Sequence, residues 1–254
     1  MTDATGADRR AALGELRQEI SACTACPRLV AWRRDAARKA PRAFVGEEYW
    51  GRPLGGFGEV DARLVLVGLA PAAHGGNRTG RMFTGDRSGD FLFAALWRAG
   101  FANQPGSRHL DDGLELEDAY VTAAVRCAPP DNKPAPDERD RCRPYLAREL
   151  SLLTAARVYV ALGAFAYDVL ARTPPIAGTL ATGTLATGTL AAGTLAAGRP
   201  RFAHGLEVEL TGLGRPSWLL CSYHPSQRNV FTGLLTPAMF DDVLRRARRL
   251  LSSS

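Results

Sequence analysis

The sequence predicts an α/β fold, a three-layer α/β/α sandwich around a central, mainly parallel four-stranded sheet. Short runs rich in leucine and β-branched residues alternate with amphipathic segments of helical length, and this alternation favours helices on both faces of a parallel sheet. The chain has 254 residues, 46% of them hydrophobic, which is enough for one substantial core. We therefore expect a single domain over residues 9–254, preceded by a flexible tail at residues 1–8.

Four short apolar runs are the predicted strands, because each has the length and β-branched content of a buried parallel strand. They are 63–68, 119–125, 157–161 and 217–222. Helices are expected at 11–21, after Pro27, at 88–100 where Ser88 is an N-cap candidate, and at about 137–153, 164–171 and 237–251. Residues 41–60 and 69–89 are rich in glycine and are predicted to be loops.

One segment breaks this alternation. Residues 178–198 repeat Gly-Thr-Leu-Ala-(Thr/Ala) four times with a period of five, which matches neither a helix nor a strand. We interpret it as part of a low-complexity insertion, at about 174–200, in a flexible surface loop. A short β-solenoid turn is the alternative.

The charge balance favours a polyanionic partner. The chain carries 32 basic and 26 acidic side chains, for a formal net charge of +6, and only Lys39 and Lys133 among the basic residues are lysines. Arginine pairs with phosphate through a planar fork, although an arginine bias also follows from genomic base composition.

No apolar run of about 18 residues and no secretory signal pattern occur, so we expect a cytoplasmic monomer without a membrane partner.

Four of the five cysteines have the spacing of a metal site. Cys23 and Cys26 form C-x2-C before Pro27, and Cys127 and Cys142 follow about 100 residues later in polar surroundings. Four thiolates suit either zinc or a 4Fe–4S cluster, and spacing alone decides poorly between them. We favour the cluster because structural zinc sites more often use two close pairs. Cys221, in an apolar run, is predicted to be a core residue.

Two loops should meet at one edge of the predicted sheet. Residues 68–86 (GLAPAAHGGNRTGRMFTGD) follow the first strand, and residues 222–229 (SYHPSQRN) follow the last. Both lie at the carboxyl edge, where open α/β sheets bind ligands. Together they resemble the signature loops of the uracil-DNA glycosylase superfamily, and the first loop resembles its type-5 branch. The resemblance spans about residues 13–250, apart from the repeat.

That resemblance implies a uracil-DNA glycosylase-like fold and a monofunctional DNA-repair enzyme. Members flip a damaged base out of double-stranded DNA and hydrolyse its N-glycosidic bond, leaving an abasic site. The type-5 branch accepts uracil, hypoxanthine, xanthine, ethenocytosine and 5-hydroxymethyluracil, and carries a 4Fe–4S cluster, here assigned to the four spaced cysteines. Neither Lys39 nor Lys133 lies in a signature loop, so no Schiff-base amine is expected.

The resemblance also assigns roles to individual residues. Phe83 would stack on the flipped base, backbone groups from Gly68 through Ala70 to Ala72 would bind its edge, and His224 would hydrogen-bond the pyrimidine O2 as negative charge develops there. The expected DNA contacts are Arg78, Arg81, Arg87, Ser226, Arg228 and Asn229, and the loop through Leu235 would wedge the strand.

Two positions depart from related branches. Ala70 replaces the carboxylate or asparagine that positions the attacking water, so Asn77 is the first candidate for that task and Asp86 the second. Ala123 replaces the asparagine that reads uracil in a related branch, which predicts a less discriminating pocket.

Three other interpretations remain open. A uracil-specific type-4 enzyme is disfavoured by Ala70, and a nucleotide hydrolase is disfavoured because the glycine-rich loop lacks the Lys-Ser/Thr of a P-loop. The third is a non-catalytic, zinc-stapled nucleic-acid-binding protein.

Overall fold

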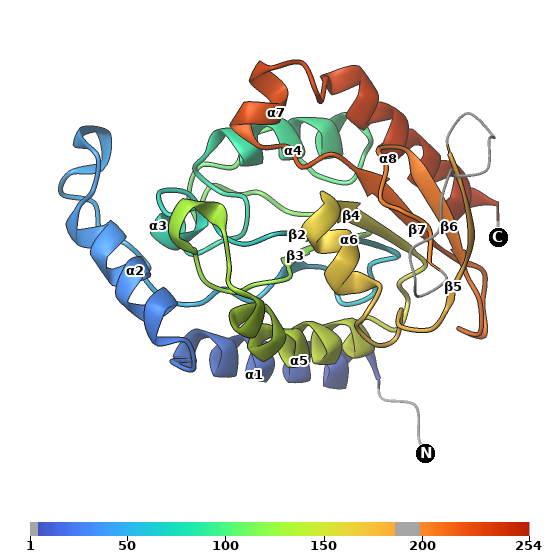
Figure 1. Cartoon of the computed structure of the whole chain (residues 1–254), viewed down its shortest axis with the longest axis horizontal. Coiled ribbons are helices and arrows are strands. Elements are labelled where there is room, and N and C mark those ends of the chain that lie inside the picture. Colours follow the sequence, from blue (N-terminus) through green and yellow to red (C-terminus); the bar gives the residue numbers. More distant parts are fainter. Residues whose placement is uncertain (1–4, 186–198, 254) are drawn as a thin grey trace.

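The computed structural model describes residues 5–185 and 199–253, which form a seven-stranded mixed sheet between two layers of helices (Figure 1). The strands are β1 (Phe57–Gly58), β2 (Leu64–Gly68), β3 (Ala119–Ala123), β4 (Val158–Leu162), β5 (Leu180–Leu185), β6 (Leu206–Leu210) and β7 (Ser217–Ser222). Their order across the sheet is β1-β3-β2-β4-β7-β6-β5. The central strands β3, β2, β4 and β7 are parallel, whereas β1, β6 and β5 are antiparallel to their neighbours.

The described residues also form eight α-helices and two short 3-10 turns. The α-helices are α1 (Gly6–Ala22), α2 (Pro27–Arg38), α3 (Gly76–Thr79), α4 (Arg87–Arg98), α5 (Pro136–Leu152), α6 (Ala164–Leu170), α7 (Gln227–Phe231) and α8 (Pro237–Ser252). The 3-10 turns are Arg42–Phe44 and Pro130–Asn132. Within residues 5–185 and 199–253, none of the helices has the length and apolar character that crossing a bilayer requires.

Strand β2 shows how the sheet divides the core. Leu64 and Leu66 pack into one apolar cluster with residues of α4 and α8, whereas Val65 and Val67 pack into a second cluster with residues of α1, α5 and α6. Successive side chains of a strand point to opposite faces, so a continuous apolar run fills both layers. Figure 1 shows α4, α7 and α8 on one side of the sheet and α1 and α5 on the other.

The predicted three-layer sandwich and its four parallel strands are confirmed, but the prediction of a four-stranded sheet omitted β1, β5 and β6. Strand β6 alternates buried Leu206, Val208 and Leu210 with more exposed glutamates. This period of two is typical of an antiparallel strand with one face toward solvent, so the signal was present in the sequence. The expected loop over residues 41–60 contains β1 and one 3-10 turn.

The structure differs from the prediction in the repeat segment and in the predicted N-terminal tail. The first part of the repeat, Leu180–Leu185, is strand β5 paired with β6, and residues 186–198 lie outside the described residues. At the other end, α1 begins at Gly6 inside the predicted tail, because Thr5 and Asp8 form a capping box. The Thr5 hydroxyl accepts from the Asp8 amide at 3.2 Å, and the Asp8 carboxylate accepts from the Thr5 amide at 3.0 Å.

Candidate active site

The two signature loops meet at the carboxyl edge of the parallel strands, as predicted. The first loop leaves β2 at Gly68, which lies in register with Ala123 at the end of β3. The second leaves β7 at Ser222, whose carbonyl accepts from the Gly163 amide just after β4 at 2.7 Å. The ends of all four central strands therefore surround one place, where an open α/β sheet binds its ligand.

Phe83 is buried at this place in a left-handed backbone conformation, with φ of 53°. Its ring covers Gly68, because a Cβ on that glycine would lie 2.5 Å from Phe83 Cζ. Its carbonyl oxygen touches the first turn of α4, where a Cβ on Gly89 would lie 1.8 Å away. The two glycines are thus required by the position of Phe83, whose ring centroid lies 6.0 Å from that of His224.

His224 is half-buried, but its Nε2 atom is buried and has no hydrogen-bond partner among the described residues. Burial lowers the pKa of the imidazole to about 4, so the ring is neutral at physiological pH. The side-chain Nδ2 of Asn229 donates to the His224 carbonyl at 2.9 Å. The Ser226 hydroxyl accepts from the backbone N–H of Asn229 and thereby caps α7. Ser226 and Asn229, predicted as DNA contacts, therefore hold the His224 loop.

The remaining predicted base-binding positions are backbone or alanine. Ala123 is buried at the end of β3, and Ala70 is half-buried against the apolar cluster that contains the cysteines. The Ala72 carbonyl accepts from the amides of Gly75 and Asn77 at 3.2 and 3.1 Å. Because neither Ala70 nor Ala123 has a polar side-chain atom, any side-chain contact to a base edge or to water must come from other residues.

The two candidates for water positioning have different surroundings. Asn77 is 1% exposed, and its Nδ2 donates to the carbonyls of Arg33 and Ala73, while its Oδ1 is buried without a partner among the described residues. An unpaired buried acceptor is a place where a water or ligand atom is expected. Asp86 caps α4 by accepting from the Gly89 amide at 3.0 Å, and burial raises its pKa.

Two of the arginines predicted to contact phosphate already form ion pairs within the protein. Arg81 is 7% exposed and forms an ion pair with Asp112, so its guanidinium is not available to DNA. Arg78 stacks on Phe44 and pairs with Glu47 at 2.5 Å. The ion pair of Arg81 argues against a direct phosphate contact, because a buried arginine that leaves its carboxylate partner leaves a buried charge unpaired. The partner of Arg78 is exposed, and Arg78 borders an open cleft.

The other arginines and the tip of the second loop face solvent. Arg87 and Arg228 are exposed. Beyond Arg228, Phe231 is 87% exposed and Leu234 is 47% exposed, although both are large apolar residues. Arg228, Phe231 and Leu234 thus present charge and apolar surface to solvent from one short segment.

An open cleft of about 960 Å³ joins the two loops. Its walls include Trp32, Phe44, Ala72, Asp86, Arg108 and Gln227. Aromatic rings, arginines and loop residues from both signature segments therefore border one hollow.

Cys23, Cys26, Cys127 and Cys142, the predicted metal ligands, line one small cavity. Nowhere in residues 5–185 and 199–253 do three or more His, Cys, Asp or Glu side chains form a group that could hold a metal ion. Four thiolates on one zinc ion, at about 2.3 Å each, would lie within roughly 4 Å of one another. In a 4Fe–4S cluster each thiolate binds a different iron, so the four sulfur atoms lie farther apart than around one zinc ion. Cys221 is fully buried in β7 among core residues.

Arg33 joins the cysteine cavity to the first signature loop. Its Nη1 donates to Cys127 Sγ at 3.2 Å, and its carbonyl accepts from Asn77 Nδ2 at 3.3 Å. Sequence analysis missed this residue, although a signal existed. Leu29, Arg33 and Ala36 are the buried residues of α2, and an arginine at that helical spacing must have internal partners.

The model of the uracil-DNA glycosylase superfamily matches residues 56–248 of the chain. The chain belongs to this superfamily. Its relatives include the type-5 uracil-DNA glycosylase of Mycobacterium tuberculosis, which is 50% identical over 237 residues, covering 93% of this chain and 81% of the relative. The type-5 uracil-DNA glycosylase of Thermus thermophilus is 48% identical over 233 residues, covering 92% of this chain and 95% of the relative.

The type-4 branch is less similar. The type-4 uracil-DNA glycosylase of Thermotoga maritima is 31% identical over 150 residues, covering 59% of this chain and 60% of the relative. The resemblance to the type-5 branch, first found in the loop at residues 68–86, thus extends over most of the chain.

Proposed function

We propose that this protein is a monofunctional DNA-repair glycosylase that removes uracil and other deaminated or damaged bases from double-stranded DNA. It flips the base out of the duplex and hydrolyses the N-glycosidic bond, leaving an abasic site. The observation that carries the proposal is the pairing of Phe83 with the unpartnered Nε2 of His224 at the carboxyl edge of the sheet. Membership of the glycosylase superfamily supports the reaction class.

In this proposal, Phe83 and His224 contact the flipped base in different ways. Phe83 stacks on the flipped base, and the neutral imidazole of His224 donates its Nε2 proton in a hydrogen bond to the pyrimidine O2. Negative charge develops on that oxygen as the glycosidic bond breaks, and a donor fixed in a dry site stabilises it by several kcal/mol. The lowered pKa of His224 suits this task, because a neutral ring donates without adding a permanent charge to the empty pocket.

Water reaches the sugar with little assistance. Asn77 is the first candidate to position it, since its buried Oδ1 has no partner among the described residues, and Asp86, which borders the cleft, is the second. Ala70 and Ala123 offer no polar side-chain atom to the base, so shape and stacking select the substrate. Hypoxanthine, xanthine, ethenocytosine and 5-hydroxymethyluracil are therefore accepted besides uracil.

The second loop, together with Arg87 at the start of α4, binds the DNA. Arg228 and Arg87 contact the phosphates, and the exposed Phe231 and Leu234 fill the gap that the flipped nucleotide leaves. Ser226 and Asn229 act at the base of this loop, through the bonds that hold His224.

The four cysteines hold a 4Fe–4S cluster. When bound, the cluster supplies folding free energy and no chemistry on the base, because it joins segments that are distant in the sequence. Burial raises the pKa of Cys26 and of Cys127, and the nearby Arg141 and Arg33 oppose these shifts, so the two arginines favour the thiolate forms that bind iron.

A strand-cleavage assay tests the proposal. Duplex oligonucleotides with one uracil or one hypoxanthine are treated with enzyme and then alkali, and iron and zinc are measured on the same protein. Cleavage at both bases by iron-containing protein is the expected result. Cleavage at uracil alone would indicate a type-4-like specificity, and intact strands bound by zinc-containing protein would indicate a non-catalytic DNA-binding protein. A borohydride-trapped adduct would contradict monofunctional chemistry.

A further inference from the structure

The conformation of Phe83 requires an explanation outside the pocket. A φ of 53° places a bulky aromatic residue in the left-handed region, where non-glycine residues other than Asn and Asp are uncommon. Such a conformation persists only where the surrounding structure over-determines it, and it occurs preferentially at functional sites. The residues on both sides of Phe83 show what over-determines it.

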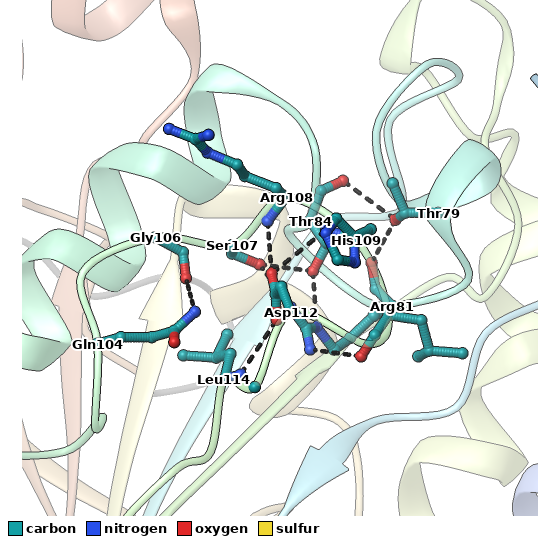
Figure 2. Close-up of polar contacts among 12 residues, drawn as sticks. Thr79, Arg81, Thr84, Gln104, Gly106, Ser107, Arg108, His109, Asp112 and Leu114 are labelled. Carbon is teal, nitrogen blue, oxygen red and sulfur yellow. Dashed lines mark hydrogen bonds and ion pairs between the residues drawn. The ribbon is translucent and has the colours of Figure 1, made fainter.

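Arg81, two residues before Phe83, is the centre of a buried polar network (Figure 2). Its Nη2 donates to both carboxylate oxygens of Asp112 at 2.7 and 2.8 Å, and to Ser107 Oγ at 3.2 Å. Its Nη1 donates to the Leu110 carbonyl at 3.1 Å, and its Nε donates to Thr84 Oγ1 at 2.9 Å. The side chains of Arg81 and Asp112 are 7% and 8% exposed, so the pair is screened little by water.

Asp112 organises the loop that receives this arginine. Its carboxylate accepts from the backbone amides of Arg108, His109 and Leu114, at 2.6, 3.3 and 3.1 Å. Although burial opposes ionisation, the bonds from Arg81 and these amides lower the pKa of Asp112 to about 2. The carboxylate is therefore charged throughout the working pH range, and it holds the loop in one conformation.

The residues after Phe83 are tied to the same loop. Thr84 Oγ1 and Ser107 Oγ are 2.7 Å apart and share a hydrogen bond, and the Gly85 amide donates to the Ser107 carbonyl at 2.8 Å. On the other side, Thr79 Oγ1 donates to the Thr84 carbonyl at 3.2 Å. The backbone is thus fixed immediately before and after Phe83, which leaves that residue no room to relax.

We propose that Arg81, Ser107 and Asp112 are positioning residues that set the pocket through Phe83, although none of them touches the base. They hold Phe83 in its left-handed conformation with the ring over Gly68, so the loop at residues 107–112 determines how well a flipped base stacks. The inference rests on the proposed stacking role of Phe83. Arg81, a candidate phosphate contact by sequence, thereby acts from inside the fold.

A double-mutant cycle tests the inference. Asp112→Asn and the milder Ser107→Ala are each made in the wild-type and in a Phe83→Leu background, and single-turnover release of uracil from duplex DNA is measured. Residues that act as a unit have non-additive effects, so each change should slow release about tenfold in the wild type and less than about twofold in Phe83→Leu. Glu207→Gln, which breaks the bidentate pair between β6 and Arg246, is the matched control and should leave the rate unchanged.

Hydrogen exchange gives a second readout that does not need activity. The amides of residues 80–86 should exchange faster in Ser107→Ala and Asp112→Asn than in Glu207→Gln, at temperatures where all three are folded. Equal slowing of base release in both backgrounds, or unchanged exchange at residues 80–86, would overturn the inference. A wild type that releases no base would contradict the proposed function, while the exchange experiment would still measure whether the network holds Phe83.

Discussion

The two loops that form the candidate site are built in opposite ways. In the first, Arg78, Arg81 and Asn77 point into the protein and are hydrogen-bonded to it, although their residue types are common in DNA contacts. In the second, Arg228 and Phe231 point into solvent. His224, near the start of the second loop, instead turns inward toward Phe83.

This difference separates two tasks. The polar side chains of the first loop hold the Phe83 ring and the buried Oδ1 atom of Asn77 in place. A site that is already held in place needs no reorganisation when charge develops on the base. The second loop offers charge and apolar surface to a partner that arrives from outside, and exposed groups steer and anchor DNA without perturbing the core. Changes in the inward groups should affect the rate of base release, whereas changes in the outward groups should affect binding.

The largest effect is expected for His224→Ala, which removes the proposed donor to the developing charge. Single-turnover release of uracil should slow about 100- to 1000-fold, as for the loss of one oxyanion donor, with little change in the Kd for DNA. His109→Ala, which removes an exposed imidazole from the surface, is the control. A loss below about fivefold would exclude His224 from the reaction.

A smaller effect, and on binding, is expected for Phe231→Ala. Removing an aromatic ring that fills the gap in the duplex should weaken the Kd for uracil-containing duplex about tenfold, as expected for one lost stacking contact. The free energy of unfolding should change by no more than about 0.5 kcal/mol, because the ring is exposed. Trp97→Ala, at the far end of α4, removes another exposed ring, and a Kd that rises equally in both variants would contradict the wedge.

Arg228→Gln should have a weaker effect of a different kind. One lost phosphate contact should lower the slope of log K against log salt concentration by about 1, with unchanged release from bound DNA. Arg10→Gln removes the same charge from α1 and should leave the slope as it is. A changed slope for Arg10→Gln alone would place the DNA surface elsewhere.

The smallest effect concerns pH. His224 has a pKa of about 4 in the folded protein, against 6.5 for an ordinary histidine, because burial disfavours its charged form. The unfolded chain therefore binds the extra proton between these values, so the contribution of His224 to stability is complete above about pH 6.5 and falls as the pH decreases toward 4. NMR titration of the His224 ring checks the pKa, and a midpoint near 6.5 would contradict the dry site.

Patterns that are local in the sequence predicted much of this protein. The four central strands are continuous apolar runs, and a run of that length and composition must be buried on both faces wherever it lies. The cysteine spacing predicted that four cysteines share one site, and the position of both loops after strands predicted that the two loops would meet at one edge of the sheet. Parallel strands bring their carboxyl ends together, so this juxtaposition followed from the fold class.

The roles of Arg81 and β5 could not be predicted from such patterns. An arginine that binds phosphate and an arginine that binds Asp112 have the same local sequence, and the partner lies 31 residues away. Strand β5 is formed by part of a repeat with no strand period, because the unpaired edge of β6 offers its backbone hydrogen bonds. Whether a polar group faces solvent or a partner depends on contacts between distant segments, and these exist only once the chain has folded.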